Sequence, residues 1–551
     1  MEVLGQIKQL LDNKKSFLLE AGAGSGKTRT LIESIKYLID TQSKSLFETN
    51  KGIACITYTN VAVDEINERI DNHPLVLAST IHEFLWHVIK SYQKELKIEV
   101  LKYNDEESRN PIDDLKNLLK TKTIEYSQYG RKFEEGRITH EDVIKFSSRI
   151  FNKYPKIGKI VTNKFPYIFI DEYQDTEEKT VKLLVDDLLT KNIGNITLGF
   201  FGDSMQKIYN QGIGKIEDKK IINVTKKDNY RCSQKVIDLL NAIRPELIQN
   251  AAGNNKKGSV SFLSCNNDLN NPKNYEKTIS FLKNKGWEFE RGKDGVLKTK
   301  ILMLTHRGIA NKLEYESLLS TYQILGRWGR DRLLNKEDIF ASFILNKIEK
   351  LIEFFENKKY GEFIKLLGIS GYKINKHDDK KIINDLVKNL IELRKNKSIE
   401  EVFNFVFDNN LLVKPIKMIE FIDKLEDEGN EVKKNFYESL MKLKYNEFIP
   451  FYNYIEELTP FSTKHSVKGT EFENVLVVID DSSWNQYKFN DVFSNSTVNK
   501  NRFNRSKNLL YVCCSRAKDN LVILSLSNMD GTAMTTIKKW FNGNISYIET
   551  I

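Results

Sequence analysis

The sequence has few cysteines and no long hydrophobic run. Its five cysteines include no CxxC pair, and its seven histidines are scattered along the chain. An iron–sulfur cluster or a zinc site is therefore not expected, and the cysteines should be reduced thiols that are mostly buried. No stretch approaches about 18 uninterrupted apolar residues, and residues 1–16 lack the apolar centre of a signal peptide. We therefore expect a cytoplasmic protein with no membrane partner.

Internal repeats and low-complexity linkers are also absent. The 551 residues suffice for about three to five domains, each with its own core. Hydrophobic residues make up 40% of the chain and charged residues 29%, which is typical of globular proteins. The net charge of +10 is compatible with a polyanionic partner such as nucleic acid but does not require one.

A glycine-rich segment at residues 21–28, with the sequence AGAGSGKT, predicts a phosphate-binding loop. It follows an apolar run at 16–20 and precedes a helical pattern at 30–38. Such a loop requires this order of strand, glycine-rich turn and helix, because glycines let backbone N–H groups turn toward phosphates. The residues expected to surround the phosphates are Gly22, Ala23, Gly24, Ser25, Gly26, Lys27 and Thr28.

Two residues of this loop have specific roles. Lys27 can reach the β- and γ-phosphates of ATP, and the Thr28 hydroxyl can ligate Mg²⁺. The strict pattern begins with glycine, whereas this chain has Ala21. A glycine-rich loop alone could be an ordinary turn, so the prediction depends on a matching acidic motif.

That acidic motif is DEYQDT at residues 171–176, directly after the apolar run 167–170. Asp171 is suited to hold Mg²⁺, and Glu172 is suited to orient and deprotonate the attacking water. Two adjacent carboxylates at a strand end repel one another, and a bound cation removes that repulsion. The motif therefore predicts the catalytic edge of an ATPase.

Three further residues are expected to act on the γ-phosphate. Gln206 follows the strand-like run 196–201 and can hydrogen-bond the phosphate or the water. Arg231, in NYRCS, and Arg516, in CCSRAK, lie in a second α/β region and can stabilise the charge that develops in phosphoryl transfer. An arginine supplied by a separate domain also couples hydrolysis to domain closure.

The order of strand-like and helical segments predicts two α/β domains, each with a mainly helical insertion. Further apolar, strand-like runs occur at 53–57, 301–304, 474–479 and 521–524, and two charged helical stretches interrupt the series. The expected segments are a first domain at 1–87 and 161–219 with an insertion at 88–160, and a second domain at 220–330 and 458–551 with an insertion at 331–457.

Together the motifs resemble those of the UvrD/Rep/PcrA-like superfamily 1 DNA helicases. The matching segments, in order, are AGAGSGKTRT, ITYTNVAVDEI, STIHEF, DEYQDT, GDSMQKIY, NYRCS, TKHSVKGTEFENV and LLYVCCSRAKDNL. The resemblance implies a P-loop NTPase fold with two RecA-like parallel-sheet motor domains and ATP with Mg²⁺ in the cleft between them. It also implies 3′-to-5′ translocation on single-stranded DNA, and it equates the two insertions with the accessory subdomains 1B and 2B.

The resemblance assigns residues that bind the nucleoside. Gln6 falls where the family reads adenine, with Gln9 as a rival. Arg29 and Tyr230 occupy the positions that sandwich the adenine ring, and Glu471 matches the residue that binds the ribose.

The resemblance also assigns residues to the DNA side. They are Thr57, Thr59, Asn60, Thr80, His82, Thr463 and His465. Short hydroxyl and amide side chains suit contacts to phosphate and sugar. The family's tryptophan that stacks on a DNA base is absent from residues 208–214, where Tyr209 is the nearest substitute.

More loosely, the compact chain resembles the helicase-like subunit of Gabija-type anti-phage systems, which works with a separate ATPase–nuclease. The expected function is an ATP-dependent DNA helicase or translocase that acts on single-stranded or tailed duplex DNA. The missing tryptophan and the short second insertion leave an alternative, a subunit that senses ATP and DNA and licenses a nuclease with little unwinding of its own. A small-molecule kinase would not need the NYR, KGTEF and final arginine motifs.

Overall fold

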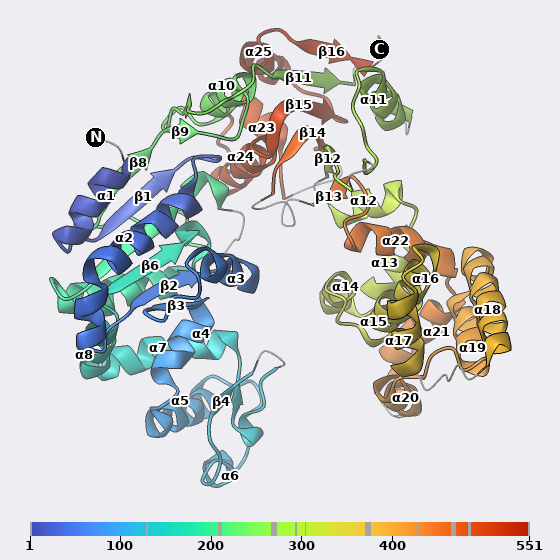
Figure 1. Ribbon diagram of the computed structural model, residues 1–551, viewed down its shortest axis with the longest axis horizontal. Coiled ribbons are helices and arrows are strands. Elements are labelled where there is room, and N and C mark those ends of the chain that lie inside the picture. The colour runs from blue at the N-terminus through green and yellow to red at the C-terminus, as the bar shows by residue number, and fades with distance from the viewer. Residues whose placement is uncertain are drawn as a thin grey trace. The chain divides into compact units, whose positions relative to one another are not determined.

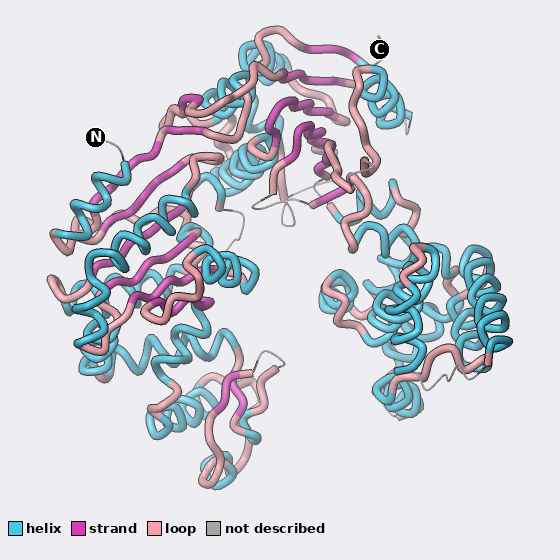
Figure 2. The backbone as a smooth tube through the Cα atoms, viewed as in Figure 1, coloured by secondary structure: helices cyan, strands magenta, loops and turns pink. Residues whose placement is uncertain are grey.

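The structure is a computed structural model and describes residues 3–127, 130–207, 212–265, 273–292, 295–303, 305–369, 376–427, 429–463, 470–482 and 486–548. Helices and strands alternate along much of the chain (Figures 1 and 2). The chain forms two compact units, one of Met1–Leu263, Asp480–Val522 and Ser527–Ser546, the other of Ser264–Ile479, Ile523–Leu526 and Tyr547–Ile551. The domain segments expected from the sequence stay a prediction.

The first sheet has six strands in the order β3-β2-β6-β7-β1-β8, and every neighbouring pair is parallel. The strands are β1 (Phe17–Ala21), β2 (Ile53–Thr57), β3 (Val76–Thr80), β6 (Tyr167–Asp171), β7 (Thr197–Gly202) and β8 (Ile222–Lys226).

The register of this sheet brings three loops to one edge. Glu20 of β1 lies opposite Gly202 of β7, and Asp171 of β6 lies opposite Phe201 of β7. Parallel strands present their carboxyl ends at the same edge of a sheet. The segments that follow β1, β6 and β7 are therefore neighbours, and they are the phosphate loop, DEYQDT and GDSMQ.

Helices connect these strands and follow them along the first unit. The α-helices are α1 (Val3–Asp12), α2 (Lys27–Glu48), α3 (Asn60–Arg69), α4 (Ile81–Ile89), α5 (Gln93–Glu106), α6 (Leu115–Leu118), α7 (His140–Lys153), α8 (Pro155–Lys164), α9 (Glu178–Lys182), α10 (Gln234–Ile243), α23 (Phe489–Ser494), α24 (Lys500–Cys514) and α25 (Gly531–Trp540). The short 3-10 segments are η1 (Phe133–Glu135), η2 (Tyr173–Asp175), η4 (Thr190–Asn192) and η5 (Ser204–Gln206), and a π-helical segment is η3 (Leu183–Leu189).

Alternate residues of each strand pack on opposite faces of the first sheet. On one face, Phe17, Phe169 and Phe201 pack with residues of α1, α2 and α3. The ring centroids of Phe17 and Phe201 are 5.5 Å apart, and those of Phe169 and Phe201 are 5.7 Å apart, both with edge-on geometry. On the other face, Leu18 and Ile168 belong to a second buried cluster.

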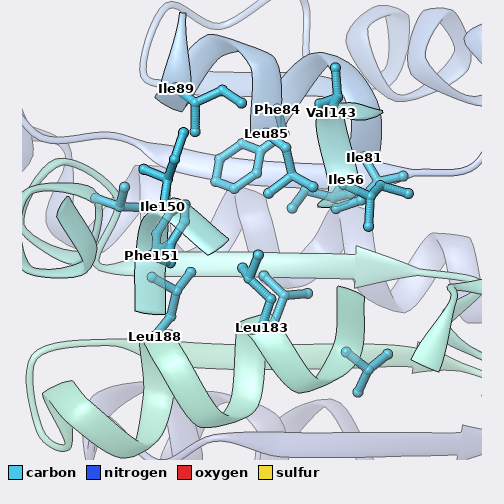
Figure 3. Close-up of a cluster of buried hydrophobic side chains, with 14 of the residues drawn as sticks. Ile56, Ile81, Phe84, Leu85, Ile89, Val143, Ile150, Phe151, Leu183 and Leu188 are labelled. Atoms are coloured by element: carbon cyan, nitrogen blue, oxygen red, sulfur yellow. The ribbon is translucent and has the colours of Figure 1, made fainter. Parts of the chain in front are cut away.

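This second cluster continues into the first insertion. Phe84 and Leu85 of α4 and Ile150 of α7 lie near Leu183 and Leu188 of η3 (Figure 3). The same cluster contains buried residues between positions 96 and 138, which come from the insertion. The first insertion therefore shares its core with one face of the sheet.

The second sheet also has six strands, in the order β13-β12-β14-β15-β11-β16. The strands are β11 (Ser259–Ser264), β12 (Thr299–Leu302), β13 (Phe461–Ser462), β14 (Phe472–Ile479), β15 (Ala517–Ser525) and β16 (Ile545–Tyr547). Strand β12 pairs in parallel with β13 and with β14. Two small sheets pair β4 (Glu125–Tyr126) with β5 (Arg137–Ile138) and β9 (Asp228–Asn229) with β10 (Asn250–Ala251).

The second unit is mainly helical between β12 and β13. Its helices are α11 (Lys273–Asn284), α12 (His306–Lys312), α13 (Glu316–Gln323), α14 (Gly326–Leu334), α15 (Ile339–Phe343), η6 (Ile344–Glu349), α16 (Lys350–Glu356), α17 (Tyr360–Ile369), α18 (His377–Asn396), α19 (Ile399–Asp408), α20 (Ile416–Asp423), η7 (Lys424–Glu426), α21 (Glu431–Lys442), η8 (Tyr445–Glu447) and α22 (Phe448–Ile455). Two six-stranded sheets with helices around them confirm the predicted α/β fold class. Within the described residues, none of the helices combines the length and apolar character that crossing a bilayer requires.

Several strands were not predicted from the sequence. In the two large sheets they are β3, β8, β11, β13 and β16, of which β3 and β8 form the two edges of the first sheet and β13 and β16 those of the second; the strands of the two small sheets were not predicted either. Edge strands are less buried than central ones, and β8 buries only Val224. The sequences of β3 and β8 therefore lack the continuous apolar run that marks a central parallel strand, and serines interrupt the apolar residues of the inner strand β11.

Packing of the phenylalanine rings gives a test of the first sheet. A Cβ atom at Gly199 of β7 would lie 2.6 Å from the Phe169 ring and 2.9 Å from the Phe17 ring. We expect Gly199→Ala to lower the free energy of unfolding by about 1–3 kcal/mol, because the added methyl group overpacks the core. Urea unfolding measures the change.

Gly361→Ala is the matched control. A Cβ atom at Gly361 in α17 meets nothing within 4 Å, so this change should leave stability unaltered or raise it slightly. If Gly199→Ala and the wild type unfolded at the same urea concentration, the close packing of the phenylalanine rings around Gly199 would be contradicted.

Candidate nucleotide-binding site

The phosphate loop runs from Gly22 to Gly26 and leads directly into helix α2. Gly24 and Gly26 have φ angles of 71° and 76°, a left-handed backbone that residues with a side chain rarely adopt. Helix α2 begins at Lys27, and no described side chain caps its first turn. Its first N–H groups and its dipole therefore favour an anion at this point.

The loop also contains a buried polar atom that fits a ligand. Ser25 is 1% exposed, and its Oγ atom has no hydrogen-bond partner among the described residues. Buried polar groups are normally hydrogen-bonded, so a phosphate oxygen would complete the environment of this hydroxyl. Together with the uncapped helix, this atom fits a bound nucleoside triphosphate.

Three buried side chains from distant parts of the sequence hold the phosphate loop. Asn229 Nδ2 and Gln249 Nε2 each donate a hydrogen bond of 3.0 Å to the Ala23 carbonyl. The Ala23 N–H donates to the Tyr511 hydroxyl at 3.1 Å. Asn229 Oδ1 also accepts the Arg231 N–H at 3.0 Å. The same asparagine therefore fixes both the loop and the backbone of a predicted catalytic arginine.

The glycines permit this close approach. A Cβ atom at Gly22 would lie 2.4 Å from the Gln249 side chain. A Cβ atom at Gly24 would lie 2.7 Å from Asn229 Oδ1 and 2.8 Å from the Cβ atom of Arg231. Arg231 thus lies directly beside the phosphate loop.

The acidic motif forms a tight, hydrogen-bonded turn after β6. Glu172 has a φ of 50°, which is uncommon for a residue with a side chain and is found at functional sites. The Glu172 N–H donates to Asp171 Oδ1 at 3.1 Å, and Gln174 Nε2 donates to Glu172 Oε2 at 2.5 Å. Gln174 Oε1 in turn accepts the Asp203 N–H at 3.0 Å. The amide of Gln174 thus links the predicted base to the loop after β7.

Gln206 and Arg516 meet in the interior. Arg516 Nη2 donates to Gln206 Oε1 at 3.5 Å, and Arg516 Nε donates to the Val512 carbonyl at 3.1 Å. Gln206 Nε2 donates to Asp203 Oδ2 at 2.7 Å. Gln206 therefore bridges an arginine of the C-terminal region and a carboxylate of the first sheet.

The electrostatics of Arg516 favour an anion. Burial, followed by the positive charge of Arg231, lowers the pKa of Arg516 to about 10, while Glu172 acts in the opposite direction. Arg516 remains protonated near pH 7, and its two charged neighbours are the residues predicted to act on the γ-phosphate. The first unit thus brings Glu172, Gln206, Arg231 and Arg516 together, although their catalytic roles stay predictions.

Two residues fit a magnesium ion. Thr28 lies in the first turn of α2, and Asp171 is the last residue of β6. Among the described residues, no group of three or more His, Cys, Asp or Glu side chains is arranged to hold a metal. Mg²⁺ in phosphate sites usually has one or two protein ligands, which Thr28 and Asp171 could supply, with phosphate oxygens and water as the others.

The structure gives the positions of the residues assigned to the nucleoside. Arg29 is largely exposed and its Nε donates to Glu33 at 2.9 Å, and the Tyr230 N–H donates to the Gly24 carbonyl at 2.9 Å. Gln6 lies in α1 and is partly exposed. Glu471 is exposed in the second unit, one residue before β14. Their contacts to adenine and ribose stay predictions.

The DNA-side residues of the first unit lie at the carboxyl ends of β2 and β3. Thr57 and Thr80 are register partners at these ends. Thr59 and Thr80 cap α3 and α4, since the Ala62 N–H donates to Thr59 Oγ1 at 3.2 Å and the Glu83 N–H donates to Thr80 Oγ1 at 3.3 Å. Asn60, the first residue of α3, is exposed. Both threonine hydroxyls therefore already have a structural role.

His82 is largely enclosed. Its ring centroid lies 4.4 Å from that of His140. Burial, and then His140, lowers the pKa of His82 to about 4, so the imidazole is neutral near pH 7. Any contact from His82 to DNA would be a hydrogen bond without charge.

The remaining DNA-side residues belong to other regions. Thr463 is buried in the second unit, beside Tyr454 in a cavity of about 510 Å³. Tyr209 and His465 lie outside the described residues, as does most of the segment that lacks the stacking tryptophan. DNA contacts from these three residues stay predictions.

Sequence reasoning missed seven residues of the site. They are Glu20, Tyr173, Asp203, Asn229, Arg244, Gln249 and Tyr511. Glu20 is a charged residue in an otherwise apolar strand, and Tyr173, Asp203, Asn229 and Tyr511 lie inside the motif segments without having been given a role. Arg244, at the end of α10, and Gln249, just before β10, lie outside all of the motifs.

The two parallel sheets and the phosphate loop define a P-loop NTPase with two RecA-like domains. A family model described as an AAA domain matches residues 6–211, and a model of the viral superfamily 1 RNA helicase core domain matches residues 408–525.

Three similar proteins agree with this class. Gabija protein GajB of Bacillus cereus is 28% identical, over 94% of each chain. The ATP-dependent DNA helicase PcrA of Staphylococcus aureus is 28% identical over 44% of this chain and 39% of PcrA. A probable DNA helicase II homolog of Mycoplasma capricolum is 23% identical over 94% of this chain and 83% of that protein. The resemblance to UvrD/PcrA-like superfamily 1 helicases and to GajB is therefore confirmed, and the chain is an enzyme of the DNA-dependent ATPase and helicase class.

The phosphate loop is tested by Lys27→Ala. We expect this change to abolish ATP hydrolysis, because it removes the ammonium group that is predicted to contact the phosphates, while some DNA binding remains. Phosphate release and a DNA mobility shift measure the two properties. Retained hydrolysis would refute the assignment of Lys27.

Proposed function

We propose that the chain hydrolyses ATP on single-stranded DNA, translocates from 3′ to 5′, and serves as the helicase-like subunit of an anti-phage defence complex with a nuclease. The observation that carries the ATPase part is the position of Arg231 beside the phosphate loop, together with Gln206 and Arg516 in one buried contact. The remaining parts rest on the DNA-side residues and on the relatives.

In this proposal the side chains divide the work of hydrolysis. Lys27 binds the β- and γ-phosphates, and Glu172 orients and deprotonates the attacking water. Arg231 and Arg516 stabilise the negative charge that develops on the transferred group, and Gln206 hydrogen-bonds the γ-phosphate. Mg²⁺, held by Thr28 and Asp171, would neutralise charge on the phosphates.

Binding of single-stranded DNA is supported by the first sheet. The carboxyl ends of β2 and β3 place Thr57 and Thr80 side by side, and the flanking Tyr58 and Val61 are exposed at 44% and 78%. Exposed aromatic and apolar side chains beside hydroxyl groups suit bases and backbone of a single strand. The 3′-to-5′ direction rests on the resemblance to helicases of this class.

The defence role is supported by the match to GajB, which spans 94% of both chains. A match of this extent includes both motor regions and both insertions, whereas the PcrA match covers less than half of either protein. A cytoplasmic location and a nuclease partner belong to this proposal.

A second candidate function is an ATP- and DNA-sensing subunit that licenses a nuclease. The sequence motivates it, because residues 208–214 lack the stacking tryptophan. Loss of one base-stacking contact is worth about 1–3 kcal/mol, which would weaken the coupling of ATP turnover to movement on DNA.

The ATPase proposal predicts a response to DNA. We expect single-stranded DNA to raise the steady-state rate of ATP hydrolysis several-fold, because strand binding completes the catalytic arrangement. Blunt duplex DNA of equal length is the control. Equal turnover with and without the single strand would count against a DNA-dependent ATPase.

Strand displacement separates the two candidate functions. A translocase should unwind a duplex with a 3′ single-stranded tail and leave a duplex with a 5′ tail intact. DNA-stimulated hydrolysis without unwinding of either substrate, together with a co-purifying nuclease, would contradict the helicase and favour the sensor. Unwinding of the 5′-tailed substrate alone would contradict the proposed direction.

A further inference from the structure

A buried cluster of charges lies directly behind the phosphate loop. Arg244 Nη1 donates to Asp203 Oδ1 at 2.6 Å, and Arg244 Nη2 donates to Glu20 Oε1. The side chain of Arg244 is 3% exposed and that of Asp203 is 0% exposed. Arg244 is not among the residues that the motifs single out, and it joins β1, through Glu20, to the segment that follows β7, through Asp203.

Glu20 is held in its charged form. Burial acts to raise the pKa of Glu20, but hydrogen bonds from Tyr173 and Ser204 and the charge of Arg244 outweigh it, so this pKa lies below its usual value. Burial acts to lower the pKa of Arg244, but Asp203, Tyr511 and Glu20 more than compensate. Glu20 and Arg244 therefore form an ion pair near pH 7.

Asp203 connects this network to Gln206. Its Oδ1 accepts from Arg244, and its Oδ2 accepts from Gln206 Nε2 at 2.7 Å. Only the NH₂ end of an amide can donate to a carboxylate, so this bond directs Gln206 Oε1 the other way, toward Arg516. The orientation of Gln206 thus depends on where Asp203 is held.

Asp203 is linked to Glu172 as well. The Asp203 N–H donates to Gln174 Oε1, and Gln174 Nε2 donates to Glu172 Oε2. Two short chains of hydrogen bonds therefore run from Asp203, one to the predicted γ-phosphate sensor and one to the predicted base.

Helix α10 ties Arg244 to the arginine beside the phosphate loop. The helix starts at Gln234, just after Arg231, and Arg244 is the residue that ends it. At about 1.5 Å per residue, its ten residues form a rigid rod of about 15 Å. In its last turn, Asn241 exchanges hydrogen bonds of 2.9 and 2.8 Å with the backbone of Gln249, whose side chain holds the loop. A shift of α10 would therefore displace Arg231 and break the Arg244 bonds together.

We infer that Arg244 is a positioning residue for ATP hydrolysis. It holds Asp203 so that Gln206 and Glu172 face the γ-phosphate. It can do so only while α10 keeps Arg231 beside the phosphate loop. This inference rests on the proposed function of the site. Arg244 contacts no nucleotide atom in this role and acts through Asp203.

The test compares Arg244→Lys with the wild type in steady-state ATP hydrolysis. Lysine keeps the charge but has no planar fork that can bond two carboxylates at once. We expect kcat to fall about 10- to 100-fold, as for other misplaced catalytic groups, with the KM for ATP changed less than about twofold. A rise in KM at constant kcat would overturn the inference.

The matched control is Arg394→Lys in the second unit. Arg394 is also a buried arginine that bonds two carboxylates, with Nη1 2.7 Å from Glu349 and Nη2 3.3 Å from Glu356. The Arg394→Lys variant should lose about as much stability as Arg244→Lys and keep the kcat of the wild type. An equal loss of kcat in both variants would show a general effect of buried arginines and overturn the inference.

A double-mutant cycle that combines Arg244→Lys with Gln206→Ala tests whether Arg244 acts on hydrolysis through Gln206. If Arg244 acts through Asp203 and Gln206, the double variant should be no slower than Gln206→Ala by more than about threefold, whereas independent effects multiply. If the losses of kcat from the two single changes multiply in the double variant, Arg244 does not act through Gln206 and the inference is overturned. If the wild type hydrolyses ATP at the same rate with and without DNA, the proposed function is refuted, but the comparison of the Arg244 variants stays valid. If the wild type does not hydrolyse ATP at all, both the proposed function and the inference are refuted.

Discussion

The phosphate loop depends on side chains that lie far away in the sequence. Asn229 and Gln249 bond the Ala23 carbonyl from 206 and 226 residues downstream, and Tyr511 bonds the Ala23 N–H from 488 residues downstream. A glycine-rich loop has few side chains of its own to fix its shape, so bonds from other parts of the chain help to set its conformation. The nucleotide site therefore exists only when the N-terminal and C-terminal parts of the chain have come together.

The same arrangement explains which features the sequence could predict. Central strands such as β1, β2, β6 and β7 are buried on both faces and read as apolar runs, and the motifs after them follow from the shared edge of the parallel sheet. Edge strands such as β3 and β8 lack that run. The bonds that hold the loop could not be predicted, even for Asn229 and Tyr511 in the quoted motifs, because hydrogen bonds across hundreds of residues leave no local pattern.

The nucleotide site also contains two buried arginines. Arg516 and Arg244 are both buried, yet their surroundings differ. Arg244 is compensated by Glu20 and Asp203, whereas the pKa of Arg516 is lowered by burial and by Arg231. Burying a charge is costly unless it is paired. The two internal carboxylates thus suit a positioning role for Arg244, and the neighbouring charge of Arg231 suits a role for Arg516 on an anion.

The central claim is that Lys27, Arg231 and Arg516 contact the same terminal phosphate. The most direct measurement is a crystal structure of the chain with ADP, Mg²⁺ and a fluoride analogue of the transferred phosphoryl group. The account predicts the Lys27 ammonium and both guanidinium groups within hydrogen-bond distance of the analogue. An analogue bound at the loop with either arginine turned away from it would contradict the account.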